Sequence, residues 1–461
     1  MPRVEMITQS SKDATLRGGI SERLINLYPE TMPEGSIARF ALRAVPGTES
    51  FAALPGVFLR GLAEMDAGED GRLIYAAIGG QAYSVDANAA SVALGALPDS
   101  EDTSLAPHRG AMVYAAGGEY HVWDGATLDE ITPTAFTDVG SVEFLSGYTV
   151  YTERGGTRFA WSALADPKDL PALNVATAEA RDDNLLRAVA VQGNLWLFKE
   201  TSAEIWGLTG LAAENAFSRL PGGVREKGLK GYNLICKVPD GAFFVGNDNA
   251  AYLLSGDDFQ PASRTPVERA IKDNQPTHCF YYEDAGHKFC VIRFRDRPAW
   301  VLDLATGFWH ERASGDVQPW KATHSVRAYG RWRLGEVSGT IRTAVEDARD
   351  AGGELIREVW SRPLFGDGRR FRVDRLEILG KVGQADIGRA PIVEVRLSRD
   401  GGVTYGTARN YSMGDLGRYD RRIVVRSGGM GRTLVAKLRI TDPADLTIYS
   451  GANLDVTEAV R

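Results

Sequence analysis

Residues 193–210 read GNLWLFKETSAEIWGLTG. A glycine turn opens this stretch, an apolar strand ending in Trp196 and Phe198 follows, and a polar turn leads into a second strand that contains Trp206. Turn residues between two short runs of aromatic and branched side chains are the signature of a β-hairpin. The stretch therefore predicts two antiparallel strands.

The same unit recurs along the chain at a spacing of roughly 37–47 residues, which is typical of four-stranded propeller blades. In a strand such as Leu73–Ala77 both alternating faces are apolar or small, so the strand needs cover on both sides, and stacked blades supply it. A parallel solenoid is the alternative, although its repeats are generally shorter and more regular. We predict an all-β fold with a propeller of six or seven blades, whose other units lie at residues 71–87, 110–126, 147–163, 240–257, 286–307 and 330–344.

A propeller ring must close, and we predict that residues 38–44, ARFALRA, complete the last blade. The pattern changes after Gly352 and Gly353, where strands begin to alternate apolar with charged residues, as in an antiparallel sandwich with one wet face. We therefore expect an N-terminal segment at 1–50, a propeller at 51–352 and a β-sandwich at 353–461. The sandwich strands are expected to begin near Arg357, Arg372, Ile392, Arg422, Leu434 and Leu446.

Length and charge narrow the class of protein. A chain of 461 residues exceeds what one core usually organises. Its formal net charge of −7 argues against a DNA-coating protein, because phosphate binding needs clustered Lys and Arg. If DNA instead passes through the protein, a weakly acidic channel lining would repel the phosphate backbone and let the DNA slide without sticking. The opening residues lack the apolar core of a signal peptide, and no apolar run is long enough to cross a bilayer, so we expect cytosolic synthesis.

The strongest enzyme-like pattern is an Asp-box, S-x-D-x-G-x-T-W with Tyr405 in the last position, formed by Ser398, Asp400, Gly402 and Thr404. Sialidases and other propeller glycosidases carry this box. Even there it is a hairpin turn whose Asp accepts backbone hydrogen bonds, so we interpret it as structural.

Three acids, Glu179, Asp183 and Glu204, lie in the central stretch. Glycoside hydrolysis needs two carboxylates at a set separation, and the sequence does not single out a pair. We interpret all three as turn formers or solvated charges at strand ends.

His278, Cys279, His287 and Cys290 form a cluster of metal-ligand residue types. If residues 283–286 are a hairpin loop, Tyr282 faces His287 and Cys279 lies opposite Cys290. We favour two buried thiols over a zinc site or an oxidised pair. Three cysteines, with Cys236, are too few for a disulfide framework.

The remaining patterns are weak. Trp123 and Asp124 match the dipeptide of WD repeats once, without its companion Gly-His. The most basic run is interpreted as a solvated strand face, with phosphate or the acidic edge of a partner as the alternative ligand. No phosphate loop, nucleophile elbow or HExxH motif occurs, so we predict no catalytic, cofactor-binding or metal-binding residues. The basic run comprises Arg369, Arg370, Arg372 and Arg375.

The central stretch also resembles a known family. The tail hub proteins of short-tailed phages, also called packaged DNA stabilisation proteins, share its acidic turn at 178–183 and the motifs that follow in the same order. The N-terminal LINLYPE at 24–30 and the C-terminal Asp-Gly and Tyr-Gly pairs at 400–401 and 405–406 extend the resemblance over most of the chain. The motifs of the central stretch are Trp196 with Phe198, Glu204 before Trp206, Thr209 with Gly210, and Lys227 with Gly228.

The resemblance implies a structural protein of the virion tail. It implies a homo-hexameric ring below the portal and adaptor rings that continues the DNA channel, helps to retain packaged DNA, and anchors tailspikes or fibres and a plug or needle. The alternatives are a propeller glycosidase or glycan-binding tail component acting on the host surface, and a cellular propeller scaffold.

Overall fold

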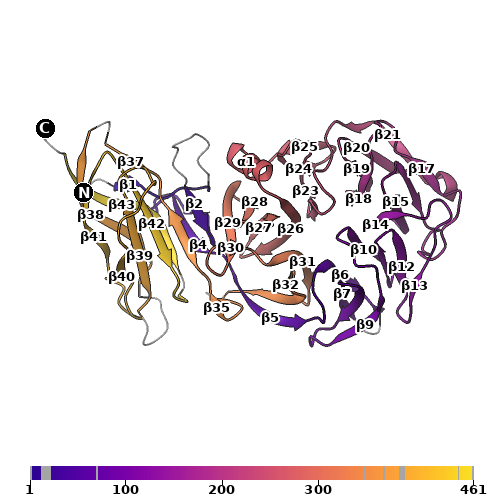
Figure 1. Cartoon of the computed structure of the whole chain (residues 1–461), viewed down its shortest axis with the longest axis horizontal. Helices are drawn as coiled ribbons and strands as arrows, with labels where there is room; N and C mark the ends of the chain where they lie inside the picture. The colour runs from indigo at the N-terminus through magenta and orange to yellow at the C-terminus, as the bar shows by residue number, and fades with distance from the viewer. Residues whose placement is uncertain are drawn as a thin grey trace.

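The computed structural model describes residues 3–11, 22–68, 71–346, 349–366, 369–383, 390–444 and 446–458. Strands dominate these ranges, and α1 (Thr265–Asp273) is their α-helix. No helix in the described part of the chain is long and apolar enough to cross a membrane. Figure 1 shows a ring of small sheets joined at one side to a second β-structure.

Five sheets contain four strands each, with sequential strands side by side. They comprise β6–β9 (Leu59–Asp66, Arg72–Ile78, Gln81–Val85, Ser91–Ala96), β10–β13 (Thr103–His108, Ala111–Ala116, Glu119–Trp123, Leu128–Glu130), β14–β17 (Val139–Leu145, Tyr148–Glu153, Arg158–Trp161, Val175–Thr177), β18–β21 (Leu185–Val191, Asn194–Lys199, Ala203–Leu208, Phe217–Arg225) and β22–β25 (Ile235–Val238, Gly241–Val245, Ala251–Ser255, Asp258–Pro261).

Two further blades belong to larger sheets. The sixth is β26 (Pro276–Asp284), β27 (His287–Phe294), β28 (Ala299–Asp303) and β29 (Phe308–Ser314), with β30 (Gln318–Pro319) beside β29. The seventh is β31 (Ala322–Ala328), β32 (Arg331–Glu336), β33 (Thr340–Val345) and β5 (Gly47–Ala53). Strand β5 also pairs with the short β34 (Arg349–Asp350), which pairs in turn with β35 (Gly353–Glu354). The described residues thus form seven blades, and the propeller is confirmed.

The first strand of each blade is the innermost. β10 lies between β6 and β14, β14 contacts β18, β26 lies between β22 and β31, and β31 returns to β6, which closes the ring. The repeated hairpins of the sequence are the middle strands of the blades, from β7–β8 to β32–β33. Their burial on both faces is confirmed, since residues 74–78 of β7 are at most 3% exposed.

One turn type sets the register of five blades. Between the first and second strands, two residues with positive φ form the turn, and the second is glycine, as in Gln192 (φ 49°) and Gly193 (φ 81°). This is the type I′ geometry, whose twist suits antiparallel strands and which favours glycine. The same turn stands at 109–110, 146–147, 285–286 and 329–330.

The blades pack through aromatic and aliphatic layers. Phe159 and Trp206 meet between the third and fourth blades with ring centroids 4.9 Å apart, and Phe198 meets Phe244 between the fourth and fifth at 5.2 Å. Helix α1 covers the layer between the fifth and sixth blades through its buried face. Such burial stabilises the folded ring by roughly 1.5–3 kcal/mol per large side chain.

The strand that closes the ring differs from the predicted one. Residues 38–44 were expected to do so, but β4 (Phe40–Ala44) pairs with β3 (Leu27–Thr31) and β43 (Thr447–Glu458) in the second β-structure. The closing strand is the next one, β5. The reason is burial: Phe40 and Leu42 fill the core of the second structure, whereas Ala52 packs with Ile341 in the propeller.

The second structure is a β-sandwich. One sheet orders β3-β4-β43-β38-β41, where β38 is Phe371–Gly380 and β41 is Ile423–Gly431, and β1 (Arg3–Glu5) pairs with β43. The other orders β36 (Arg357–Trp360), β42 (Thr433–Ile440), β39 (Ile392–Ser398) and β40 (Arg409–Ser412), with β37 (Leu364–Phe365) beside β42. All six predicted sandwich strands are present. The domain limits at 50 and 352 stay predictions.

Strand β2 (Arg23–Ile25) connects the two parts. It is parallel to β29 at Ile25 and antiparallel to β36, so the sheet of the sixth blade continues into the sandwich. Asn26 fixes the joint, because its side chain bonds Ala313 on the propeller side and Ile356 on the sandwich side. The joint therefore lies in the segment 24–30, LINLYPE, which is part of the resemblance to the tail hub family.

Candidate functional site

The central stretch is held together by buried charge. Lys199, at the end of β19, is fully buried, and its Nζ lies 2.9 Å from Oδ1 of Asp183. The ammonium also donates to the carbonyls of Ala178 and Arg181. Asp183 in turn accepts bonds from the backbone N–H and the hydroxyl of Thr201, both at 2.8 Å. The acidic turn is thus tied to the β19–β20 hairpin.

The other two acids of the stretch differ from each other. Glu204 is fully buried and accepts bonds from the Ala180 N–H at 2.8 Å and the Trp206 indole N–H at 3.1 Å, with Arg219 at 3.7 Å. Glu179 is exposed. The interpretation of Glu204 as a turn former or solvated charge is wrong, because its side chain is fully buried within β20. Asp183 acts in the turn as predicted, although its side chain is only 7% exposed.

The Asp-box of the sandwich is a satisfied turn. Asp400 accepts bonds from the Ser398 hydroxyl at 2.6 Å and the Thr404 N–H at 3.0 Å, and Ser398 Oγ accepts the Gly402 N–H at 2.8 Å. The Ser398 and Thr404 hydroxyls, followed by the Thr404 N–H, hold the pKa of Asp400 far below its usual value. The predicted structural role is confirmed.

The predicted register, which placed Cys279 directly across from Cys290, is wrong, whereas the favoured interpretation of two buried thiols is confirmed. The turn comprises Ala285 and Gly286 alone, so Cys279 lies opposite Ile292 and Cys290 opposite Tyr281. Both thiols are buried and free, and burial raises the pKa of each. Within the described ranges, no group of three or more His, Cys, Asp or Glu residues is placed to hold a metal ion.

His287 belongs to a different network. Its Nδ1 lies 2.8 Å from Oδ2 of the fully buried Asp303, whose hydrogen bond raises the pKa of His287. His278 lies apart from it, near His324, with the ring centroids 5.1 Å apart. The four residues of the predicted cluster therefore do not converge on one point.

The basic run lies on the sandwich. Arg372 and Arg375 pair with Asp374 at 2.7 Å and Glu377 at 3.1 Å on their own strand, β38. Arg369 and Arg370 line a half-apolar hollow of about 490 Å³. The single WD match is a turn, since Asp124 accepts two backbone N–H bonds and pairs with Lys168 at 2.7 Å.

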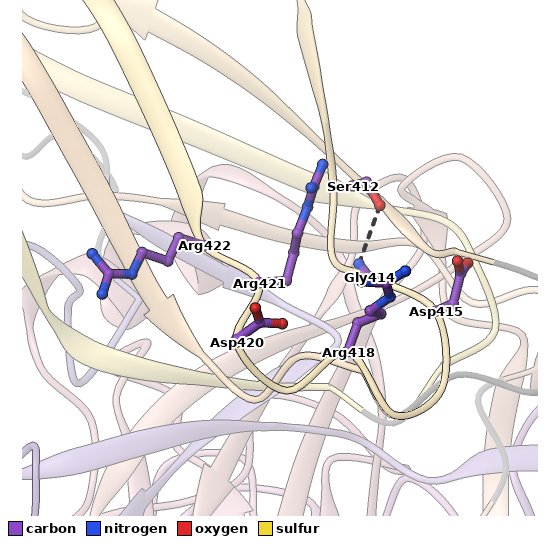
Figure 2. A pocket seen from close by; sticks show the side chains of 7 residues that line it. All are labelled: Ser412, Gly414, Asp415, Arg418, Asp420, Arg421 and Arg422. Carbon is purple, nitrogen blue, oxygen red and sulfur yellow. Dashed lines mark hydrogen bonds between the residues drawn. The ribbon is translucent and has the colours of Figure 1, made fainter.

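A second basic surface follows β40. Arg418, Arg421 and Arg422 surround an open hollow of about 580 Å³, together with Asp415 and Asp420. Figure 2 shows that the Arg422 guanidinium points away from those of Arg418 and Arg421. Arg422 instead lies 3.7 Å from Glu377. The side chains do not converge, so the hollow has no formed ligand site.

The family models cover both parts of the chain. Residues 14–345 match the model described as "Bacteriophage P22 Gp10, beta-propeller", and residues 356–456 match "Bacteriophage P22 Gp10, beta-sandwich". The chain belongs to the phage P22 Gp10 family. It is thus a member of a family of phage stabilisation, or tail hub, proteins and a component of the phage virion.

Solved structures and curated sequences add little to this Gp10-family assignment. A computationally designed protein, Ika8, matches with a TM-score of 0.39, 12% identity and coverage of 64% of this chain and 99% of its own. A streptogramin B lyase matches with a TM-score of 0.42, 14% identity and coverage of 64% and 96%. No curated protein matches the sequence.

One residue at the joint predicts a pH dependence of stability. His310 in β29 is fully buried beside Tyr28 and Phe289, and neither ring nitrogen has a hydrogen-bond partner among the described residues. Burial lowers its pKa to about 3. The unfolded chain binds a proton at this imidazole below about pH 6.5 and the folded chain does not, so stability falls as the pH falls from 7 toward 3.

We expect His310 to lower the free energy of unfolding by about 2 kcal/mol as the pH falls from 7 to 5. This interval includes about 1.5 pH units below the pKa of the histidine in the unfolded chain. His310→Phe keeps the ring contacts and removes the proton site. Urea unfolding at both pH values should show a smaller acid loss for the variant. Equal losses in the two proteins would contradict the assignment.

Proposed function

We propose that this Gp10-family chain forms a hexameric ring below the portal and adaptor rings of a phage particle. In this position it continues the DNA channel, helps to retain packaged DNA, and anchors a tailspike or fibre and a plug or needle. The observation that carries the proposal is the match of family models to both the propeller and the sandwich.

The joint between the two parts suits a ring subunit that has to withstand internal pressure. The Arg23 guanidinium pairs with the fully buried Glu311 on β29, and Arg439 of the sandwich pairs with Asp316 of the propeller at 2.8 Å. A continuous sheet also crosses the joint, and we expect it to hold the two parts together as one body, as a channel under internal pressure requires.

We further propose that the protein has no catalytic activity and binds no cofactor. The carboxylates that resemble glycosidase groups already have partners: Asp400 is held by its own turn and Asp183 by Lys199. The net charge of −7 favours passage of DNA without adhesion. In this account the chain is made in the host cytoplasm and ends in the virion tail.

The test is complementation of particles from the phage or prophage in which this gene is interrupted. We expect filled heads to lose their DNA to added nuclease, and the purified chain to restore protection. Protected DNA without the chain would refute the role in retention. Release of reducing sugar from host polysaccharide by the purified chain would instead favour a glycosidase.

A further inference from the structure

The mouth of the propeller ring contains a cavity of about 650 Å³. It is lined by the first residues of β6, β26 and β31 and by the segments that lead into β10 and β22, which are innermost strands of five blades. Arg60, Lys230, His278, Arg293 and Arg295 lie on its wall. We call it the central cationic cavity.

Two of its arginines have no carboxylate partner among the described residues. Arg293 donates to the Trp320 carbonyl at 3.2 Å and the Thr277 hydroxyl at 3.0 Å, both neutral groups. Arg295 is exposed and forms no ion pair with a described residue, and it acts electrostatically on Arg293. Asp296 acts electrostatically on Arg293 in the opposite sense, without forming an ion pair with it. Adjacent guanidinium groups that form no ion pair are a ready site for an anion.

A third arginine reinforces the positive charge from behind the wall. Arg187 of β18 stacks on the ring of Tyr232, which lines the cavity, at 4.6 Å from the ring centroid. Its Nε is buried and has no hydrogen-bond partner among the described residues. A buried cationic donor without a partner is costly unless a ligand or water satisfies it.

Two histidines, His278 on the wall and His324 beside it, are affected by the same positive charges. The Nδ1 of His278 is buried and has no partner in the described part of the chain. Burial first, and then His324, Arg293 and Arg60, hold its pKa well below the usual value. Burial also lowers the pKa of His324 to about 4. A backbone hydrogen bond at Arg60 acts against this shift, and the charges of Arg187, Arg293 and Arg60 add to it.

The acids of the wall are already engaged. Asp102 lies 3.6 Å from Arg154, and Glu101 lies 3.9 Å from Arg60, which also bonds Asp99 at 3.0 Å. These pairs neutralise Arg60, whereas Arg187, Arg293 and Arg295 form no ion pair with a described carboxylate, and Asp296 offsets only part of the charge at Arg293. The excess positive charge is therefore concentrated on the side formed by β18, β26 and β27.

We propose that the central cationic cavity binds a small phosphate-bearing anion. The guanidinium groups of Arg293 and Arg295 and the His278 imidazole line the cavity from the sixth blade, and Arg187 of the fourth blade lies behind Tyr232. Together they suit a tetrahedral, multiply charged group that accepts bonds in several directions. The cavity volume admits a ligand larger than a single phosphate.

The proposal is tested by calorimetric titration of the full chain with inorganic phosphate and with pyrophosphate at low salt. We expect saturable binding, tighter for pyrophosphate, and a rise of the melting temperature with ligand concentration. Arg295→Gln should weaken binding about tenfold or more, since it removes a charged hydrogen bond. Its side chain is exposed and forms no hydrogen bond or ion pair with a described residue, so folding should be unaffected.

Arg331→Gln is the matched control, because Arg331 is an exposed arginine on the seventh blade, outside the cavity. It should leave the affinity unchanged. No saturable binding of either anion, or an equal loss in both variants, would overturn the proposal. Displacement of pyrophosphate by a short single-stranded oligonucleotide would overturn the small-ligand assignment and place a nucleic-acid backbone there instead.

Discussion

Replacing Lys199 by Met is expected to lower the free energy of unfolding by about 3–5 kcal/mol. Its ammonium is fully buried and faces Asp183, whose side chain is only 7% exposed. Burial works against ionisation of that carboxyl, but Lys199 and the donors of Thr201 and Ser202 together hold its pKa below the usual value. Without the lysine, a buried negative charge and two buried carbonyls would lose their partner.

The matched control is Lys237→Met. Lys237 also forms an ion pair, with Glu143 at 2.8 Å, but its side chain is 51% exposed. Exposed pairs contribute about 0–1 kcal/mol. Chemical denaturation of both variants should separate them clearly, and the double variant Lys199→Met with Asp183→Asn should recover part of the loss. Similar losses at both lysines would mean that the pair at the acidic turn is not a structural element.

Replacing Gly228 by Ala is expected to lower the free energy of unfolding by about 2–4 kcal/mol. A Cβ at this position would lie closer than 3.0 Å to the backbone of Lys199 and Thr201. The Leu229 N–H bonds the Lys199 carbonyl at 2.9 Å, and the Asn247 N–H bonds the Gly228 carbonyl at 3.1 Å. The backbone is therefore held from two blades and cannot move aside without breaking these bonds.

Gly231, three residues further on, supplies the control. A Cβ there would meet its nearest atom, a methyl group of Leu234, at an ordinary 3.4 Å. Thermal unfolding of Gly228→Ala and Gly231→Ala should show a large loss for the first and little change for the second. If Gly228→Ala unfolds like the natural protein, the close approach of the two blades is not needed.

The blades were predictable because each carries its own local signal. A turn such as Gln192 and Gly193 fixes the register of its hairpin within a few residues. The strand that follows is apolar on both faces because neighbouring blades cover it. Such signals need no knowledge of distant parts of the chain, so seven separate hairpins could be found.

The predictions of the ring-closing strand and of the register at Cys279 were wrong, because the first depends on distant parts of the chain and the second on the exact length of one turn. Phe40 and Leu42 look equally suited to a propeller strand, and only the sandwich core, built from the other end of the chain, decides their place. At Cys279 the loop was taken as four residues instead of two, which moved its partner from Ile292 to Cys290.

Two features lacked any local signal. The burial of Lys199 could not be inferred, because a lysine at the end of a strand is usually solvated. The residues of the central cationic cavity come from segments spread from Phe58 to Val337, and only closure of the ring brings them together. The resemblance to the tail hub family, in contrast, was predictable, and the family models confirm it.

The most direct test of the proposed hub role is electron cryomicroscopy of particles complemented with the purified chain. The account predicts six copies of the propeller and sandwich around the channel, directly beyond the portal and adaptor rings, and their absence from particles that lack the chain. Density for the chain elsewhere on the particle, or no density on particles that nevertheless retain their DNA, would contradict it.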